Sequence, residues 1–226
     1  MSVPIITVDG PSGVGKGTLS QRLARHLGWH FLDSGALYRL LGLAARRQGV
    51  DPADEVRLEL LALKLDVRFL PSERGETTIL LNNHDVTRDI RTEQAGNDAS
   101  KVAAVPVVRA ALLQRQRDFR QLPGLVADGR DMGTTVFPDA PLKFFLTASA
   151  EVRAERRHKQ LKEKGLDASL TTLLAEIAER DERDRTRSVS PLKPAEDAII
   201  IDTSHLGIDE VFSAVLEWYH GCFGKE

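Results

Sequence analysis

A glycine-rich segment near the N-terminus constrains the fold more than any other part of this sequence. Residues 10–18 read GPSGVGKGT and stand between the β-branched run PIITVD at 4–9 and the amphipathic run KGTLSQRLARHLG at 16–28. Glycines let the backbone curl so that successive N–H groups face one anion, and the start of a helix adds the positive end of its dipole. The segment predicts a buried strand, a phosphate-binding loop and a helix that ends at Gly28.

The spacing of Gly10, Gly15 and Lys16 fits a P-loop, whose lysine reaches the β- and γ-phosphates of a nucleotide. The residue after the lysine is Gly17, where many P-loops carry Ser or Thr, and Thr18 follows. Because of this shift, the sequence does not identify which residue would bind magnesium, and Thr18 could donate to a phosphate instead. We predict that ATP is bound by the whole loop: Gly10, Pro11, Ser12, Gly13, Val14, Gly15, Lys16, Gly17 and Thr18.

Acidic residues at the ends of neighbouring strands are the candidates for holding Mg²⁺, usually through water. Asp33 ends the run WHFLD, and Asp128 ends the run LVAD. The sequence does not choose between these two. Asp139 and Asp202 are weaker alternatives.

Five short apolar runs alternate with helical patterns, which predicts an α/β fold with a parallel sheet flanked by helices. The strands are expected at 4–9, 29–33, 125–128, 142–147 and 198–202. Helices are expected at 16–28, 34–48, from Pro52 onward, and at 91–105, 106–122, 149–164, 169–185 and 208–220. Two further strands, at 65–70 and 77–82, have turns at 72–75 and 82–83.

This pattern predicts three parts of the chain. The core comprises residues 1–34, 125–148 and 198–226. The segment 35–124 is too long for a simple crossover, so we interpret it as an inserted acceptor domain. Residues 149–197 are a second candidate mobile element, with connecting helices.

Charge and composition exclude several classes of protein. The 31 Lys and Arg residues nearly balance the 33 Asp and Glu residues, and the net charge of −2 gives no reason to expect nucleic-acid or anionic-membrane binding. The single Cys222 makes an internal disulfide impossible, and no apolar run approaches the roughly 18 residues of a membrane span. We expect a cytoplasmic monomer.

Arginines interleaved with acids indicate what receives the phosphate. Arg180, Asp184 and Arg187 are spaced i, i+4, i+7 and share one helix face. A solvated helix with ion pairs would also explain this stretch, but the pair Arg130-Asp131, directly after Asp128 and Gly129, favours an anion site.

The arginine fork suits a phosphate dianion, so we assign Arg39, Arg130 and Arg187 as phosphate clamps. Asp131 has another use, because a carboxylate repels phosphate and can accept from the N4 amine of cytosine. Arg109 is a candidate donor to the acceptor edge of the same ring.

The sequence resembles the bacterial cytidylate kinases, a family of nucleoside monophosphate kinases. The resemblance runs from about residue 5 to 202 and is carried by DGPSGVGKGT (9–18), LDSGALYR (32–39), NDASKVAAVPVVR (97–109), ADGRDMGTTVFPDA (127–140) and ERDERDRTR (179–187). It implies a P-loop NTPase fold with a five-stranded parallel sheet, an inserted domain that binds the nucleoside monophosphate, and a short lid.

The resemblance also implies a reaction and a set of roles. The reaction is in-line transfer of the γ-phosphoryl of ATP to CMP or dCMP with Mg²⁺. The implied CMP-binding residues are Ser34, Tyr38, Arg39, Ser100, Arg109, Arg130, Asp131, Arg180, Asp184 and Arg187, of which Arg130 and Arg187, together with Lys16, are assigned to catalysis. Among Arg153, Arg156 and Arg157, in the expected lid, Arg156 and Arg157 are assigned to ATP, although which one reaches the transferring phosphoryl stays open.

Four alternatives differ in their testable features. A kinase for UMP, AMP or a non-nucleotide acceptor would not need Asp131 and Arg109 for a cytosine base. A GTPase needs a guanine-reading Asn-Lys-x-Asp, which the sequence lacks. A nucleic-acid binder is disfavoured by the charge balance. A P-loop protein that binds nucleotide without turnover would leave the acceptor arginines without a purpose.

Overall fold

The structure is a computed structural model, which describes residues 3–71, 77–163, 165 and 167–224. The turn predicted at 72–75 lies outside these residues. The chain divides into two compact units. Unit 1 comprises Met1–Asp33 and Arg117–Glu226, and unit 2 comprises Ser34–Gln116.

Unit 1 is built on a five-stranded parallel sheet in the order β2-β6-β1-β7-β8. All five predicted core strands are present: β1 (Ile5–Asp9), β2 (His30–Asp33), β6 (Leu125–Gly129), β7 (Leu142–Thr147) and β8 (Ile199–Asp202). Their order and the glycine-rich connection from β1 to α1 (Lys16–Leu27) confirm the expected P-loop NTPase fold.

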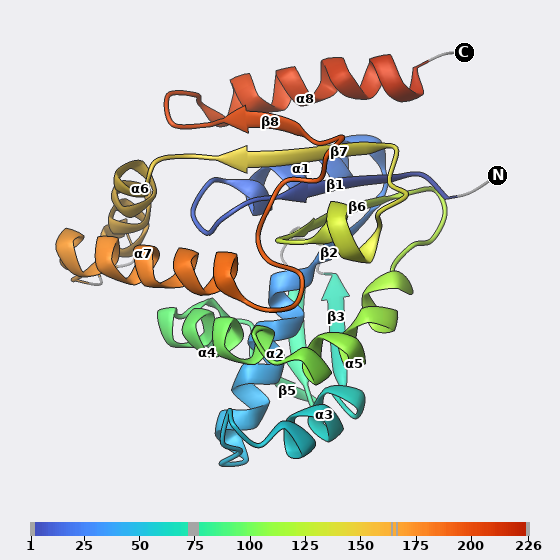
Figure 1. The fold of residues 1–226 in the computed structure, drawn as a ribbon. Coiled ribbons are helices and arrows are strands. Elements are labelled where there is room, and N and C mark those ends of the chain that lie inside the picture. Colours follow the sequence, from blue (N-terminus) through green and yellow to red (C-terminus); the bar gives the residue numbers. More distant parts are fainter. Residues whose placement is uncertain (1–2, 72–76, 164, 166, 225–226) are drawn as a thin grey trace. The chain divides into compact units, whose positions relative to one another are not determined.

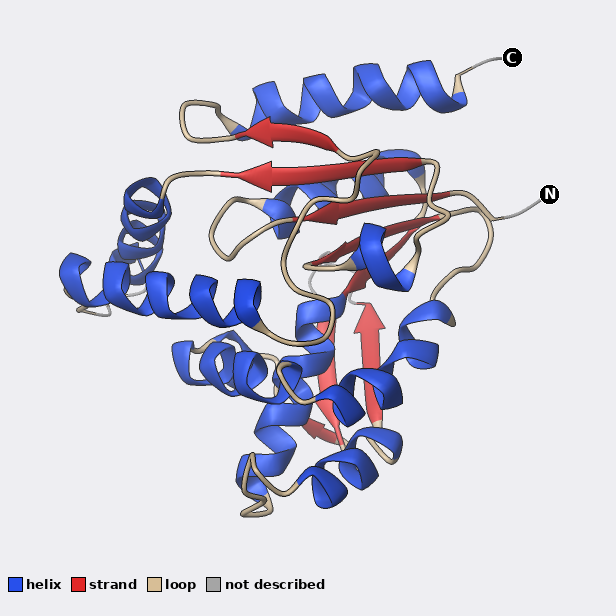
Figure 2. Ribbon diagram, in the orientation of Figure 1, coloured by secondary structure: helices blue, strands red, loops and turns tan. Residues whose placement is uncertain are grey.

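The two faces of this sheet carry different chemistry because alternate side chains of a strand point to opposite sides. Ile6 and Val8 of β1 join a core with α1 and α8 (Ile208–Phe223). Thr7 and Asp9 face the other side, where a single helical turn, η2 (Met132–Val136), lies against β1 (Figure 2). The carboxyl end of β1 therefore serves both the phosphate loop and η2.

Two helices follow β7 at the carboxyl ends of the strands. The arrowheads of β7 and β8 point toward α6 (Ala150–Glu163) and α7 (Leu170–Thr186) in Figure 1. These helices pack on each other through Ala154, Leu161 and Leu173. They have a small core of their own, separate from the core beneath α1 and α8.

Unit 2 combines helices with a small antiparallel sheet, in the order β3-β4-β5. A glycine allows its two central helices to cross closely, since a β-carbon on Gly42 of α2 would lie 2.8 Å from Asp98 Cβ of α4. The elements are α2 (Ser34–Arg47), α3 (Glu55–Leu63), β3 (Val67–Pro71), β4 (Thr77–Leu81), β5 (His84–Asp85), η1 (Asp89–Arg91), α4 (Glu93–Ala103) and α5 (Pro106–Arg117).

The structure corrects several expected boundaries. The helix expected from Pro52 begins at Glu55, because the Asp54 carboxylate accepts the Arg57 N–H at 3.0 Å and caps it. The helix expected to reach 122 ends at Arg117. The short strand β5 and the turn η2 were not predicted, because two to five residues are too few for a periodic pattern.

The expected domain bounds differ from the compact units at two places. Ser34, which the sequence assigned to the core, begins unit 2, and residues 117–124, which it assigned to the insertion, belong to unit 1. The roles of 35–124 as an acceptor domain and of 149–197 as a lid with connecting helices stay predictions. Among the described residues, no helix has the length and apolar character needed to cross a membrane.

Candidate active site

The phosphate loop has the backbone that its glycines predicted. Gly10, Gly13 and Gly15 have φ of 144°, 83° and 93°, values that side-chain-bearing residues rarely adopt. A β-carbon on Gly10 would lie 2.2 Å from the carbonyl oxygen of Leu146 in β7. The loop therefore requires glycine for its curvature and for its close approach to the sheet, and it ends at the N-terminus of α1.

Lys16 is buried at the first turn of α1. Its Nζ donates to the carbonyl oxygen of Pro11 at 2.7 Å, which closes the loop on itself. Burial lowers the pKa of Lys16 to about 7, with Arg130 adding to the effect and Asp128 and Asp9 opposing it. An anion bound in the loop would favour the charged form of this amine.

The two candidate metal acids are neighbours on the sheet. Asp33 of β2 and Asp128 of β6 are register partners at the carboxyl ends of their strands. Asp128 is buried, and one of its carboxylate oxygens lies 3.4 Å from the position of a Gly17 β-carbon. Two carboxylates beside a phosphate loop suit Mg²⁺, which takes one or two carboxylates together with waters and phosphate oxygens.

The described residues contain no cluster of three or more His, Cys, Asp or Glu side chains that could hold a metal alone.

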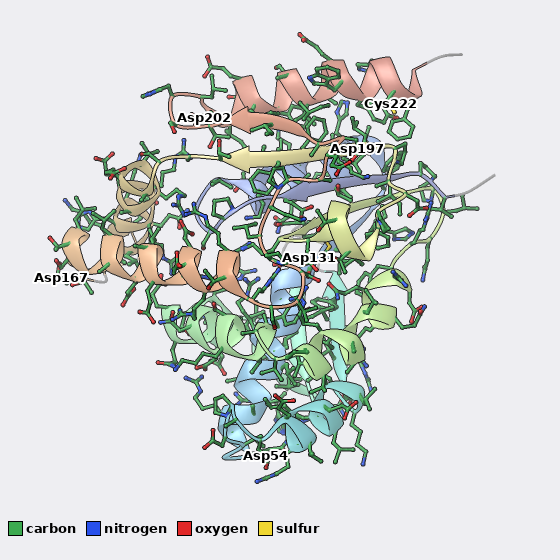
Figure 3. All side chains as sticks on the ribbon, viewed as in Figure 1. Asp54, Asp131, Asp167, Asp197, Asp202 and Cys222 are labelled. Carbon is green, nitrogen blue, oxygen red and sulfur yellow. The ribbon has the colours of Figure 1, made fainter. Side chains whose placement is uncertain are left out.

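Beyond β6, arginines and acids from distant parts of the chain meet within unit 1. Arg130 Nε donates to Asp184 Oδ2 at 2.9 Å. Burial alone would raise the pKa of Asp184, but Arg130, Arg180 and Arg187 outweigh it and lower that pKa below the ordinary value. Arg187 Nη2 lies 3.7 Å from Asp131 Oδ1, and both side chains are 3% exposed. The structure thus brings together the five charged residues of this unit that were assigned to CMP, which are Arg130, Asp131, Arg180, Asp184 and Arg187, and Figure 3 labels Asp131 among them.

The loop is tied to α6 and α7 by two arginines. Arg153 donates to the carbonyl oxygen of Ser12 at 3.2 Å and to both carboxylate oxygens of Asp181, at 3.0 and 2.5 Å. Arg180 donates to Ser12 Oγ at 3.3 Å. Arg153 is therefore engaged within the protein, so its side chain would have to leave a buried ion pair to reach a phosphoryl group.

The two arginines assigned to ATP differ in their surroundings. Arg156 donates to Oγ1 and to the carbonyl oxygen of Thr203, at 3.1 and 2.5 Å, and the same hydroxyl donates to the carbonyl oxygen of Val14 in the phosphate loop. Arg157 donates to Gln160 at 3.4 Å near the helix surface. Arg156 therefore contacts the phosphate loop indirectly, through Thr203.

Unit 2 holds the residues assigned to the base other than Asp131, which lies in unit 1. The guanidinium carbon of Arg109 lies 5.6 Å from the ring centre of Tyr38, and Arg109 Nη1 donates to the carbonyl oxygen of Ala103 at 3.2 Å. Ser34 Oγ donates to Gln116 Oε1 at 2.7 Å. These side chains are buried polar groups, which proteins keep only when they are hydrogen-bonded or functional.

The remaining two assigned residues of unit 2 lie on α4 and α2. Ser100 is buried on α4, and Arg39 is half-buried on α2.

Asp9 was not selected from the sequence, yet the pKa of its carboxyl departs strongly from the ordinary value. Its carboxylate accepts the backbone N–H groups of Met132 and Gly133, at 2.9 and 2.8 Å. Burial raises the pKa of Asp9 to about 7, because its effect and that of Asp131 exceed the opposing effects of the two N–H groups and Lys16.

One signal could have found Asp9. It ends an apolar strand in the same way as Asp33 and Asp128, so the rule that selected those two also applies to it. No comparable signal marks Gln116 or Asp181, whose partners are 82 and 28 residues away.

Comparisons with known proteins agree with the resemblance inferred from the motifs. A family model described as cytidylate kinase matches residues 6–221. The chain is 62% identical over 215 residues to the cytidylate kinase of Stutzerimonas stutzeri, covering 95% of this chain and 94% of the relative. It is 60% identical over 215 residues to that of Shewanella denitrificans, with 95% coverage of each, and 59% identical over 220 residues to that of Nitrosococcus oceani, with 97% coverage of each.

Solved structures with a similar backbone include a gluconokinase from Sinorhizobium meliloti, at 17% identity and a TM-score of 0.45 over 95% of this chain and 90% of that one. A shikimate kinase from Bacteroides thetaiotaomicron matches at 15% identity and a TM-score of 0.44 over 96% and 98%. Similarity at this level says nothing about the acceptor.

Proposed function

The chain belongs to the cytidylate kinase family and transfers the γ-phosphoryl group of ATP to CMP or dCMP. We propose that the residues described above bind the two nucleotides and catalyse this transfer in the following roles. The observation that carries the assignment is the pairing of Arg130 with Asp184 and of Arg187 with Asp131 in the unit that holds the phosphate loop. Arginines held by buried acids are preorganised for a phosphate dianion.

The phosphate loop, residues 10–18, binds the phosphates of ATP through its backbone N–H groups and Lys16. Arg156 and Arg157 assist at the ATP phosphates from α6. Lys16 Nζ donates to the carbonyl oxygen of Pro11. Bound phosphate replaces this partner and restores the full charge of the amine, whose pKa burial has lowered.

The acceptor phosphate is bound by Arg39, Arg130 and Arg187, and the ribose by Arg180 and Asp184. A ribose hydroxyl suits Asp184, because a carboxylate that three arginines keep ionised is a strong acceptor.

The cytosine base is recognised by one hydrogen-bond acceptor and one donor of the protein, which match its amine and its acceptor edge. Asp131 accepts from the N4 amine, and Arg109 donates to the acceptor edge of the ring. Ser34 and Ser100 contribute further polar contacts, and Tyr38 packs beneath the Arg109 guanidinium.

The acceptor needs no general base, because the second pKa of a phosphate monoester is about 6 and its oxygen is already anionic near neutral pH. That oxygen attacks the γ-phosphorus in line, a new P–O bond forms, and the bond to the oxygen bridging the β- and γ-phosphorus breaks to release ADP. Lys16, Arg130 and Arg187 are the catalytic residues, since they offset charge on the transferring group. Residues 149–197 act as a lid that excludes water, because water in the site would hydrolyse ATP.

Magnesium is the cofactor that we propose. Asp128 and Asp33 would hold it through water, and when bound it neutralises charge on the phosphate oxygens. Removal of divalent ions with EDTA should abolish turnover, and added Mg²⁺ should restore it. We further expect a cytoplasmic monomer.

The decisive assay measures ADP formation from Mg-ATP with CMP, dCMP, UMP, AMP, GMP or no acceptor, with the nucleotide products separated. Release of ADP matched by CDP and dCDP, and small without acceptor, is the expected result. Release of ADP that does not depend on the acceptor would mean that the arginines have another purpose.

A further inference from the structure

The turn that carries Arg130 and Asp131 is fastened at one point to β1. Directly after Asp131 the chain forms η2, in which the Thr135 and Val136 N–H groups reach the carbonyl oxygen of Asp131. The first N–H groups of a helical turn have no partner within it. Those of Met132 and Gly133 are satisfied by the side chain of Asp9.

The contact is tight and excludes water as a substitute. Asp9 is 5% exposed. A β-carbon on Gly133 would lie 2.9 Å from Thr7 Oγ1 and 3.4 Å from Asp9 Oδ2, so the backbone of the turn lies directly on β1. A shorter side chain at position 9 would leave two buried N–H groups without an acceptor, at a cost of about 1–3 kcal/mol each.

The contact between η2 and β1 fixes the position of the two charged residues that precede η2, Arg130 and Asp131. Arg130 meets Asp184 at 2.9 Å, and Asp131 lies 3.7 Å from Arg187. Both partners come from α7 or its C-terminal cap, so the turn must hold its position on β1 for these pairs to form. Asp9 does not belong to these pairs. It contacts the turn through the backbone N–H groups of Met132 and Gly133, and its charge also acts on Asp131.

We propose that Asp9 is a positioning residue for the acceptor nucleotide, which holds the turn 130–133 on β1 and thereby orients Arg130 and Asp131. The proposal rests on the function proposed above. It assigns a role in acceptor binding to the residue that directly precedes the phosphate loop, whose sequence position alone would suggest a role in ATP binding.

The test compares Asp9→Asn with the wild type at about pH 8, which keeps the Asp9 carboxylate ionised. The amide has the same shape but offers one oxygen, so its NH₂ group faces one of the two backbone donors. The matched control is Asp209→Asn, which removes a carboxylate of unit 1 that pairs with Arg22. Asp209 lies in the first turn of α8, outside every segment assigned to the nucleotides or to the lid.

Three quantities are measured on each protein: the KM for CMP, the ratio of kcat/KM for CMP to that for UMP, and the Kd of Mg-ADP by calorimetry. For Asp9→Asn we expect the KM for CMP to rise about 10- to 100-fold and the CMP-to-UMP ratio to shrink, with the Kd of Mg-ADP changed less than about threefold. The control should match the wild type in all three.

Two results would overturn the proposal. One is a KM for CMP and a base ratio equal to those of the wild type. The other is a loss of Mg-ADP affinity as large as the loss for CMP, which includes a variant that does not fold, because Asp9 would then support the phosphate loop or the unit as a whole. Absence of CMP phosphorylation by the wild type would instead refute the proposed function, so the two failures are distinguishable.

Discussion

Replacing Asp9 with asparagine should change how the stability of the ligand-free protein depends on pH. Most carboxyl groups of this protein with a perturbed pKa have one below the ordinary value, but burial raises the pKa of Asp9 from 3.8 to about 7. A raised pKa means that the folded chain binds a proton which the unfolded chain has already released. The contribution of Asp9 to the free energy of unfolding is therefore greatest below pH 3.8 and falls as the pH rises toward 7.

The size of the effect follows from these two pKa values. Between about pH 4.5 and 6.5, the Asp9 carboxyl is mostly ionised in the unfolded chain and mostly protonated in the folded one. With nearly one proton of difference, each pH unit lowers the free energy of unfolding by about 1.4 kcal/mol, so the whole window costs on the order of 2 kcal/mol. Lys16, whose pKa is lowered to about 7, stays charged in both states over this window and adds little.

The assay is urea unfolding of the wild type and Asp9→Asn at several pH values in this window, without nucleotide or Mg²⁺. Groups that do not interact with Asp9 contribute equally to both proteins, so the difference between their free energies of unfolding reports on Asp9 and on the neighbouring charges of Asp131 and Lys16 that act on it. This difference should change by about 2 kcal/mol across the window, with the wild type losing stability relative to the variant as the pH rises. Parallel pH profiles would refute the reasoning, because Asp9 would then have the same pKa in both states.

Three further predictions concern the site itself. Lys16→Ala should lower kcat by at least about 100-fold in a folded protein, since a preorganised charge at the transferring phosphoryl is lost, and near-normal turnover would contradict the P-loop assignment. Asp131→Ala should lower kcat/KM for CMP by about 10- to 100-fold more than for UMP, and an equal loss for both bases would show that this carboxylate does not read the base. Arg153→Met should lower the free energy of unfolding by about 3–5 kcal/mol, because it leaves the 7%-exposed Asp181 without its bidentate partner; a loss below about 1 kcal/mol in urea unfolding would speak against a buried ion pair.

Much of the fold is determined by short-range patterns. The short apolar runs predicted all five strands of the parallel sheet, because the strands of a parallel sheet covered by helices are rich in apolar residues. The phosphate loop is equally local, because the three glycines that adopt positive φ, Gly10, Gly13 and Gly15, all lie within this short segment. The motifs were also specific enough to identify the family, which the relatives at about 60% identity confirm.

Other features depend on which strands and helices meet. Asp33 and Asp128 are 95 positions apart along the chain, and only the register of β2 and β6 makes them neighbours. Spacing placed Arg180, Asp184 and Arg187 on one helix face, but α7 ends at Thr186 and Arg187 is its non-helical C-terminal cap. Spacing also did not pair Asp184 with Arg130 or Arg187 with Asp131, which are 54 and 56 positions away. The resemblance grouped these residues, whereas the distances between them come from the structure.

Burial is the property that the sequence by itself could not supply. Asp9 reads as an ordinary acid at the end of a strand, and its perturbed pKa arises because η2 covers it from a segment 123 positions away. Arg153 likewise reads as one of several surface arginines on a charged helix, whereas the packing of α6 on α7 pairs it with Asp181. Local sequence determined the loop, the strands and the residue types of the site. Tertiary structure decided which charges are paired and which are desolvated, because both depend on contacts between segments far apart in the chain.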